Sequence, residues 1–448
     1  MTFAPTLEHI TRNNNPARNF SSQHLENLYF FGVIFIYLPL LPIGNAETQP
    51  FIWLFVVLLG APWLLLNGNQ RINTFSLYGF AFATIIWARL WVDSINGTPD
   101  IAFSVKYIFI ILCLCTSFLV KSGHTRTALN CVIIAHVIVL GISIIPGLNS
   151  AFSSAMTMFF GRYSGDLFDV RGLSYFAPEP SYAAICLGGL LALDQIEKAK
   201  AHKRIFDLRT GTIIILLMST KALMGAVILL IFGLSFLIGR PSLVKTICAA
   251  AGAALVGIVS LNSGRVSQLL EMLKAIDWSQ LDLETSLTAI SLVEASGSTR
   301  LITNSSAFLG GIKNWHGNGI GSYGQQWVTW ADAAGWQLLE RHEVLGDAYK
   351  AGLPATNHSV IANLTFEVGA IFIIWYLAFL SYVFINKEMK HRWTCFWYVF
   401  LLTIFLSLFQ YQITNPMIWY IFIVYKAIYT NSAEETSPAT SLIKLAKA

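Results

Sequence analysis

The sequence predicts an all-α integral membrane protein of about twelve transmembrane helices with a large helical external loop. Of its 448 residues, 55% are hydrophobic and only 12% are charged, and the mean hydropathy is +0.59. A soluble domain carries roughly twice that charged fraction. The apolar residues also form separate runs, and each run approaches the about 20 residues that an α-helix needs to cross a bilayer.

The apolar runs that we expect to span the membrane lie near 28–43, 51–67, 75–92, 102–120, 127–147, 177–194, 244–261, 361–385, 394–411 and 413–430. The stretch 211–238 is either one long helix or a short pair broken at Ser219-Thr220-Lys221. Charge bias favours the pair, because only the pair gathers most Lys and Arg of the short loops on the side that holds both termini. By the positive-inside rule this side is the cytoplasm.

This topology predicts five successive regions: a cytoplasmic tail (1–27), transmembrane helices (28–261), an external loop (262–356), the last three transmembrane helices (357–430) and a cytoplasmic tail (431–448). A shorter external loop is expected at about 148–176. Helical periodicity at 266–276 and 283–294 predicts amphipathic segments in the long loop. The six cysteines lie in or beside apolar runs, so no disulfide framework is expected.

A first cluster of candidate functional residues is RGLSYFAPEPSYAA, at 171–184. Pro180 suits the first position of a helix, and Glu179 would then lie beside the helix N-terminus. Glu179 is either an acid that compensates the helix dipole or a functional carboxylate held at the membrane boundary, where an idle charge is costly.

A second cluster lies at 295–324 in the long loop. Ser298 or Thr299 is expected to cap a short helix that begins near Arg300. A guanidinium beside a helix N-terminus predicts an anion site. The glycines that follow are expected to form a tight turn that exposes its backbone, or else a simple flexible loop; they are Gly317, Gly319, Gly321 and Gly324.

The third cluster lies where the long loop re-enters the bilayer, with His358 at the boundary and Glu367 further along. A histidine can accept a proton from a hydroxyl group near neutral pH. The alternative is a histidine that caps the helix or lies at the interface. His316 and His342 are competing candidates in the same loop.

Three cations lie inside or at the edges of spans and approach the external side: Arg89, Lys106 and Lys221. Together with loop arginines they would make one anion site at membrane level; these arginines are Arg162, Arg171, Arg265 and Arg300. Snorkelling is the alternative explanation for the first two. The sequence has no external Asp-x-Asp pair, no metal-ligand spacing and no ATP motif, so neither a metal nor a cofactor is expected.

At these clusters the chain resembles the O-antigen ligase and polymerase family of bacterial envelope enzymes. The similarity rests on the large loop before the last three spans, on Arg300 followed by the G-x-G-x-G turn at 317–321, and on the segments Asn357-His358-Ser359 and Glu367-Val368-Gly369. The Asn and His stand in the reverse of the family's commonest order. The segment 176–181, FAPEPS, looks more like the Glu-Pro-Ser segment of repeat-unit polymerases than like the ligases.

The resemblance implies a glycosyltransferase that polymerises undecaprenyl diphosphate-linked repeat units of O-antigen, capsule or exopolysaccharide on the periplasmic face of the bacterial inner membrane. It implies His358 as the base, with Glu179 in reserve. The diphosphate contacts are then expected from Arg171, Arg300, Arg162, Arg89 and Lys221.

The implied partners are the lipid-linked donor and acceptor, membrane lipid and, as a further candidate, a chain-length regulator; nucleic acid is not among them. The nearest alternative is a ligase that transfers the glycan to lipid A-core or to a protein. An alternative of a different class is a polysaccharide or lipid transporter, which predicts inverted repeats and polar residues near the bilayer midplane.

Overall fold

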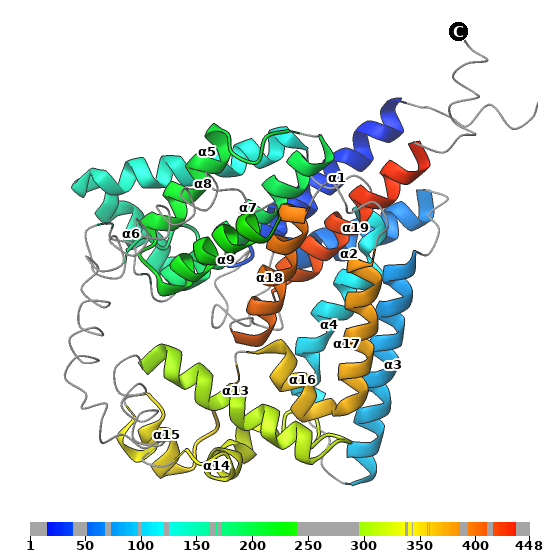
Figure 1. Ribbon diagram of the computed structural model, residues 1–448, viewed down its shortest axis with the longest axis vertical. Helices are drawn as coiled ribbons and strands as arrows, with labels where there is room; N and C mark the ends of the chain where they lie inside the picture. The colour runs from blue at the N-terminus through cyan, green and yellow to red at the C-terminus, as the bar shows by residue number, and fades with distance from the viewer. Residues whose placement is uncertain are drawn as a thin grey trace, which may run out of the picture.

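The computed structural model describes residues 16–38, 52–67, 73–96, 101–120, 125–160, 163, 167, 172–201, 203–239, 295–336, 339–342, 344–355, 357, 359–385, 393–409 and 415–435. Within these residues the regular structure is entirely helical, with sixteen α-helices and two short 3-10 helices. The all-α class predicted from the sequence is therefore confirmed (Figure 1). The expected span at 244–261 and the periodic segments at 266–276 and 283–294 lie outside the described residues.

Two described helices are long and apolar enough to cross a membrane: α3 (Thr74–Ile95) and α5 (Arg126–Ile144). Seven further helices are apolar but shorter over their described residues; they belong to α2 (Ile52–Asn67), α4 (Ile101–Cys115), α8 (Leu208–Ser219), α9 (Leu223–Gly239), α17 (Ala370–Phe384), α18 (Trp393–Phe409) and α19 (Met417–Glu435). At about 1.5 Å per residue the 22 residues of α3 extend about 33 Å, slightly more than the hydrocarbon thickness of a bilayer.

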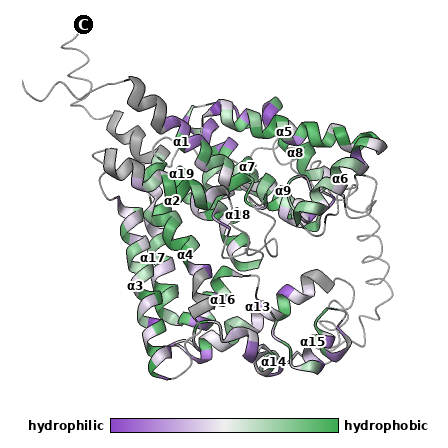
Figure 2. Cartoon of the chain, turned by 180° about the vertical axis from the view of Figure 1, so that it is seen from behind, coloured by the Kyte–Doolittle hydropathy of each residue, from purple (hydrophilic) through white to green (hydrophobic). Residues whose placement is uncertain are grey.

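The outward faces of these helices are apolar as well as the inward ones. On α3 the exposed fractions of Leu77 and Trp87 are 59% and 66%, and on α17 that of Ile374 is 69%. Contiguous apolar surface of this kind is unfavourable in water and is what a lipid-facing helix requires. Hydrophobic residues run along α3, α5, α9 and α17, whereas α13 (Ala295–Lys313) and α14 (Tyr323–Ala333) are more polar (Figure 2). The fold is that of a membrane-associated protein.

The centre of the bundle is α7 (Pro180–Lys200), whose side chains are almost all buried. It packs against α8, α9, α18 and α19. Two adjacent glycines allow the close approach, since a Cβ on Gly188 would lie 2.8 Å from Ile228 and one on Gly189 2.6 Å from Met417. Small residues commonly bring helices together in this way within membranes.

A second hydrophobic core lies below the bundle, between α13, α14 and α15 (Gly346–Ala351) (Figure 1). Its largest buried side chains are Tyr323 and Trp327. The short helix α16 (Val360–Val368) belongs to both cores, because Phe366 packs into the lower one and Leu364 into the bundle. We call the α13–α15 unit the lower lobe; α16 is therefore the element that joins it to the bundle.

Two sequence predictions about helix ends are confirmed. The stretch 211–238 is a pair of helices, α8 and α9, broken where Lys221 has a positive φ of 48°. Helix α7 begins with Pro180 at its first turn, and Glu179 is its N-terminal cap residue.

Three helix boundaries differ from the expectation. Helix α1 (Pro16–Ile34) begins inside the segment expected to be a tail, and α6 (Pro146–Phe160) occupies the first part of the shorter external loop. The expected single span at 361–385 is two helices, α16 and α17, because Gly369 adopts φ 87° and ψ −162°, which no α-helix contains.

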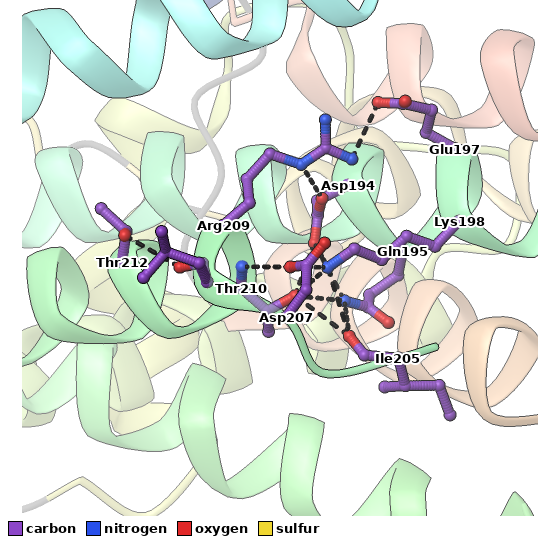
Figure 3. Close-up of polar contacts among 10 residues, drawn as sticks. Asp194, Gln195, Glu197, Lys198, Ile205, Asp207, Arg209, Thr210 and Thr212 are labelled. Carbon is purple, nitrogen blue, oxygen red and sulfur yellow. Dashed lines mark hydrogen bonds and ion pairs between the residues drawn. The ribbon is translucent and has the colours of Figure 1, made fainter. Parts of the chain in front are cut away.

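A cluster of charged side chains fastens the end of α7 to the start of α8 (Figure 3). Lys198 forms ion pairs with Asp194, at 2.8 Å, and with Asp207, while Arg209 pairs with Asp194 and with Glu197, the latter at 3.0 Å. Both Asp194 and Lys198 are buried, with side chains 0% and 2% exposed. The cluster is thus a set of mutually compensated buried charges, the only form in which such charges are stable.

Asp207 also caps α8, because its Oδ1 accepts the amide proton of Thr210 at 3.0 Å. Burial alone raises the pKa of Asp207, but the hydrogen bonds from Lys198 and Thr210 and the charges of Lys198 and Arg209 lower it overall. A carboxyl group with a depressed pKa stabilises the fold above its unfolded pKa of about 3.9, and this contribution is lost as the pH falls further.

We predict that Lys198→Met destabilises the protein by about 3–5 kcal/mol, because it leaves Asp194 buried without its ammonium partner. The matched control is Lys203→Met, an exposed lysine in the same connection, which should change stability by less than about 0.5 kcal/mol. Unfolding titrations in detergent measure both. Equal stability of the two variants would show that the cluster does not hold α7 and α8 together.

Candidate functional site

The candidate site is the place where the break between α16 and α17 meets the G-x-G-x-G turn of the lower lobe. A helix break leaves backbone N–H and C=O groups without their helical partners. Here Asn318 N donates to Phe366 O at 2.8 Å and Gly319 N donates to Glu367 O at 3.2 Å. In the opposite direction, Ala370 N donates to Trp315 O at 2.7 Å. The turn therefore supplies the hydrogen bonds that the break removes.

Glycine is required on both sides of this contact. A Cβ on Gly317 would lie 2.6 Å from Glu367 O, and one on Gly369 would lie 2.4 Å from Trp315 O. Gly317, Gly319 and Gly321 also have positive φ angles of 84°, 104° and 79°. The glycines thus form the expected tight turn, and they let its backbone touch the backbone of the break.

An ion pair on α3 holds the outer edge of the turn. Arg89 pairs with Asp93 at 2.7 Å and its Nη1 donates to His316 O at 2.6 Å. Asp93, which is 1% exposed, accepts the amide proton of Ile320 at 2.9 Å. Arg89 and Asp93 therefore bind the residue before Gly317 and the residue after Gly319, so the ion pair fixes the turn around these two glycines.

A second ion pair lies on the inner side of the turn. Lys106 of α4 pairs with Glu367 at 2.8 Å, and Tyr107 donates a hydrogen bond to the other carboxylate oxygen. Asn363 donates to the Tyr107 hydroxyl at 3.0 Å, which directs the single phenolic proton towards Glu367. Both oxygens of the buried Glu367 therefore accept hydrogen bonds, as a carboxylate does. An ion pair between apolar helices is costly to bury, so its presence here makes this region a candidate functional site.

Sequence reasoning singled out Lys106 and Glu367 separately but did not pair them, since 261 residues separate them in the chain. The available signal was that both are ionisable residues inside apolar runs, which in membranes usually face a partner.

Four of the predicted site residues lie outside the described residues: His358, Arg162, Arg171 and Arg265. The neighbours of His358 are firmly tied. Asn357 donates to Thr303 O of α13 at 3.0 Å, and Ser359 donates to Ser407 O of α18 at 2.9 Å. The re-entry segment is therefore anchored to both the lower lobe and the bundle.

The first cluster and the break at Lys221 lie side by side. Leu173 N donates to Ser219 O at 3.1 Å, and a Cβ on Gly172 would lie 2.3 Å from Thr220 O. Glu179 is half-buried at the start of α7, and Lys221 is exposed. These residues form a group separate from the Arg89 and Glu367 pairs.

The expected cap before Arg300 is wrong. Helix α13 begins by Ala295, so Ser298 and Thr299 lie inside it and Arg300 stands beyond its first turn. The Ser298 hydroxyl is instead 2.7 Å from His342 Nε2. The helix N-terminus expected beside Arg300 is therefore absent, because α13 already extends through this residue.

Hydrogen bonding determines the tautomer of His342. Its Nδ1 accepts the amide protons of Val344 and Leu345, both at 3.1 Å. The proton of a neutral ring must then be on Nε2, which donates to the Ser298 hydroxyl. His342 is a buried structural histidine in this arrangement, whereas His316 is exposed at the end of α13.

Within the described part of the chain, no group of three or more His, Cys, Asp or Glu side chains is placed to hold a metal ion. Comparison of the sequence with protein-family models and with curated proteins gives no match, and comparison of the fold with solved structures gives none either.

We predict that Gly369→Ala destabilises the protein by more than about 4 kcal/mol, because the added methyl group would collide with the Trp315 carbonyl and separate the two backbones. The matched control is Gly335→Ala. Gly335 has a similar φ of 81° but nothing within 4 Å of its Cβ position, so only the backbone strain of about 1–2 kcal/mol is expected. Equal losses in detergent unfolding titrations would contradict a role for the contact.

Proposed function

We propose that this chain is an integral-membrane glycosyltransferase that polymerises undecaprenyl diphosphate-linked oligosaccharide repeat units on the periplasmic face of the bacterial inner membrane. The observation that carries the proposal is the contact between the 317–321 turn and the 367–369 bend. These are two of the segments on which the family resemblance rests, and they form one hydrogen-bonded unit beside buried ion pairs.

The proposed topology has about twelve spans, with both termini in the cytoplasm and the loop 262–356 outside. The third span then runs outward, so the end of α3 that carries Arg89 and Asp93 is external. The lower lobe contacts this end of α3 through the turn, which is consistent with an external lobe.

The proposed reaction is a glycosyl transfer to a sugar hydroxyl. The acceptor oxygen forms a bond to the anomeric carbon of the growing chain, and the bond from that carbon to the diphosphate oxygen breaks. The hydroxyl proton passes to His358, and the diphosphate leaves as an anion. The protein orients the hydroxyl and neutralises the leaving charge.

The cations differ in how well they suit the leaving diphosphate. Arg89 already binds Asp93 and His316 O, and its side chain is only 12% exposed. We assign Arg89 to positioning the turn. The diphosphate contacts are proposed to come from the remaining cations, which are Arg162, Arg171, Lys221 and Arg300.

Two alternatives would use the same external end of the bundle. A ligase would accept the same donor and transfer its glycan to lipid A-core or a protein, so only the acceptor differs. A transporter would move the lipid-linked glycan without breaking a glycosidic bond. The FAPEPS segment favours the polymerase over the ligase.

The decisive experiment incubates purified protein in proteoliposomes with lipid-linked repeat units and resolves the products by size. A ladder of polymer supports the proposal, transfer only to added lipid A-core supports the ligase, and movement of intact substrate supports the transporter. The ladder is expected to form in excess EDTA, since the sequence has no external Asp-x-Asp pair. Loss of the ladder in EDTA and its return with magnesium would contradict metal-independent transfer.

Within this assay we predict that His358→Ala yields only single repeat units, because the acceptor hydroxyl loses its base. General bases contribute about 10²–10⁴-fold to such rates. The expected alternative, a histidine that caps the helix, is wrong, because the N-cap residue of α16 is Ser359, whose Oγ accepts the amide proton of Ala362 at 3.0 Å. His358→Asn therefore leaves the cap intact and introduces a polar side chain that accepts no proton at neutral pH. Polymer of normal length from His358→Asn would exclude the base role and transfer it to Glu179 or His316.

The topology makes a further prediction. Alkaline-phosphatase fusions at Asp332, in α14, should be active, and fusions at His202, in the connection between α7 and α8, should be inactive. Alkaline phosphatase becomes active only outside the cytoplasm, so the two fusions report on opposite sides of the membrane. An inactive fusion at Asp332 would overturn the external placement of the lower lobe, whatever the reaction proves to be.

A further inference from the structure

The external end of α3 carries a row of exposed apolar side chains. Trp87 and Trp91 are 66% and 62% exposed and stack on each other with ring centroids 6.2 Å apart. Ile95, one turn further, is 71% exposed. Exposed tryptophans at the end of a membrane-length helix are typical of the interface between hydrocarbon and headgroups, where the ring is apolar and the indole N–H reaches water. This row therefore marks the external level of the membrane.

The lower lobe is fastened at the same level. Arg89 and Asp93 lie between and beside the two tryptophans in the sequence of α3, and they bind His316 O and Ile320 N. These two contacts place the C-terminal end of α13, and the turn that follows it, at the same height along α3 as the tryptophan row (Figure 1).

That end of α13 also exposes large apolar side chains. Ile312, in the last turn of α13, is 68% exposed, and Trp315, in the turn that follows the helix, is 73% exposed. In the core of the lower lobe, Tyr323 and Trp327 are only 2% and 1% exposed. Ile312 and Trp315 are more exposed than the other large apolar side chains that the structure describes in the lobe, such as Val344 and Leu353, which are each 54% exposed. Exposed apolar side chains of this size favour an apolar environment.

We propose that the C-terminal end of α13 docks in the external lipid interface through Ile312 and Trp315, at the same height along α3 as Trp87 and Trp91. The partner is the lipid bilayer itself, because Arg89 and Asp93 hold the adjoining turn at the height where the exposed tryptophans of α3 mark the lipid interface. The glycine turn then lies at headgroup level. A lipid-linked diphosphate sits at that level too, so it reaches the turn by lateral diffusion in the bilayer.

The docking itself rests on the membrane placement of α3 and not on the proposed glycosyl transfer. A tryptophan side chain can also stack on a sugar ring, which would make Trp315 a glycan platform instead. The position of Trp315 at the height of the tryptophan row favours lipid, and the experiment distinguishes the two.

The test places the photoreactive residue p-benzoyl-phenylalanine at position 315 or 312 of the full chain in proteoliposomes made with radiolabelled phospholipid. Position 344 is the control, because Val344 is equally apolar and 54% exposed but lies beside α15, at the end of the lobe away from α3 (Figure 1). After irradiation we expect phospholipid adducts at 315 and 312, and at 344 only the level of the unirradiated sample.

Two results would overturn the proposal. One is no phospholipid adduct at 315 and 312 above the unirradiated level, or as much adduct at 344 as at 315. The other is an adduct at 315 that forms only when lipid-linked glycan is added and carries that glycan. A normal polymer ladder alongside either result would leave the proposed activity standing, and phospholipid adducts in a protein without a ladder would leave the docking standing.

Discussion

The hydrogen bonds by which residues 315–319 satisfy the break at Gly369 are the constraint on which the rest of the structure depends. Backbone groups without partners are expensive in apolar surroundings, and irregular backbone at membrane depth is tolerated only where other protein covers it. The turn provides that cover. Because the break is satisfied, α16 can depart from the axis of α17 and pack into the lower lobe while still belonging to the bundle. One local contact thus determines how the two cores are joined.

Charge within the bundle follows the same rule of internal compensation. Arg89 is matched by Asp93, Lys106 by Glu367, and Lys198 by Asp194 and Asp207. Each pair also ties together two parts of the chain: α3 and the turn, α4 and α16, or α7 and α8. Breaking such a pair costs more than forming it gains, because the remaining charge is left in a medium of low polarity. The described membrane-level charges therefore contribute mainly to specifying which elements meet.

The sequence predicted the parts of this fold that local patterns encode. Apolar runs located most helices, the polar interruption at Lys221 located the break between α8 and α9, and Pro180 located the start of α7. The break at Gly369 was not predictable locally, since Gly79 lies in a similar apolar run and α3 continues through it. The difference between the two glycines is a distant hydrogen-bond acceptor: next to Gly369, the amide of Ala370 donates to the carbonyl of Trp315. The prediction that a helix begins near Arg300 with Ser298 as its cap was wrong for a related reason. Ser298 forms a hydrogen bond with the distant His342 instead of capping α13.

The pairing of buried charges indicates which cationic side chains are available to bind an anionic substrate. A cationic side chain buried in the bundle without a counter-ion would destabilise the substrate-free protein. Arg89, Lys106 and Lys198 accordingly each have a carboxylate beside them. A cation at the water boundary is hydrated while it waits, and it gives up that water only when a phosphate replaces it. Under the proposed function, the leaving diphosphate would therefore be bound by loop cations, whereas the buried ion pairs hold the glycine turn in place. This difference follows from solvation, and it explains why Arg89, which is paired with Asp93, is better suited to positioning the turn than to binding a substrate.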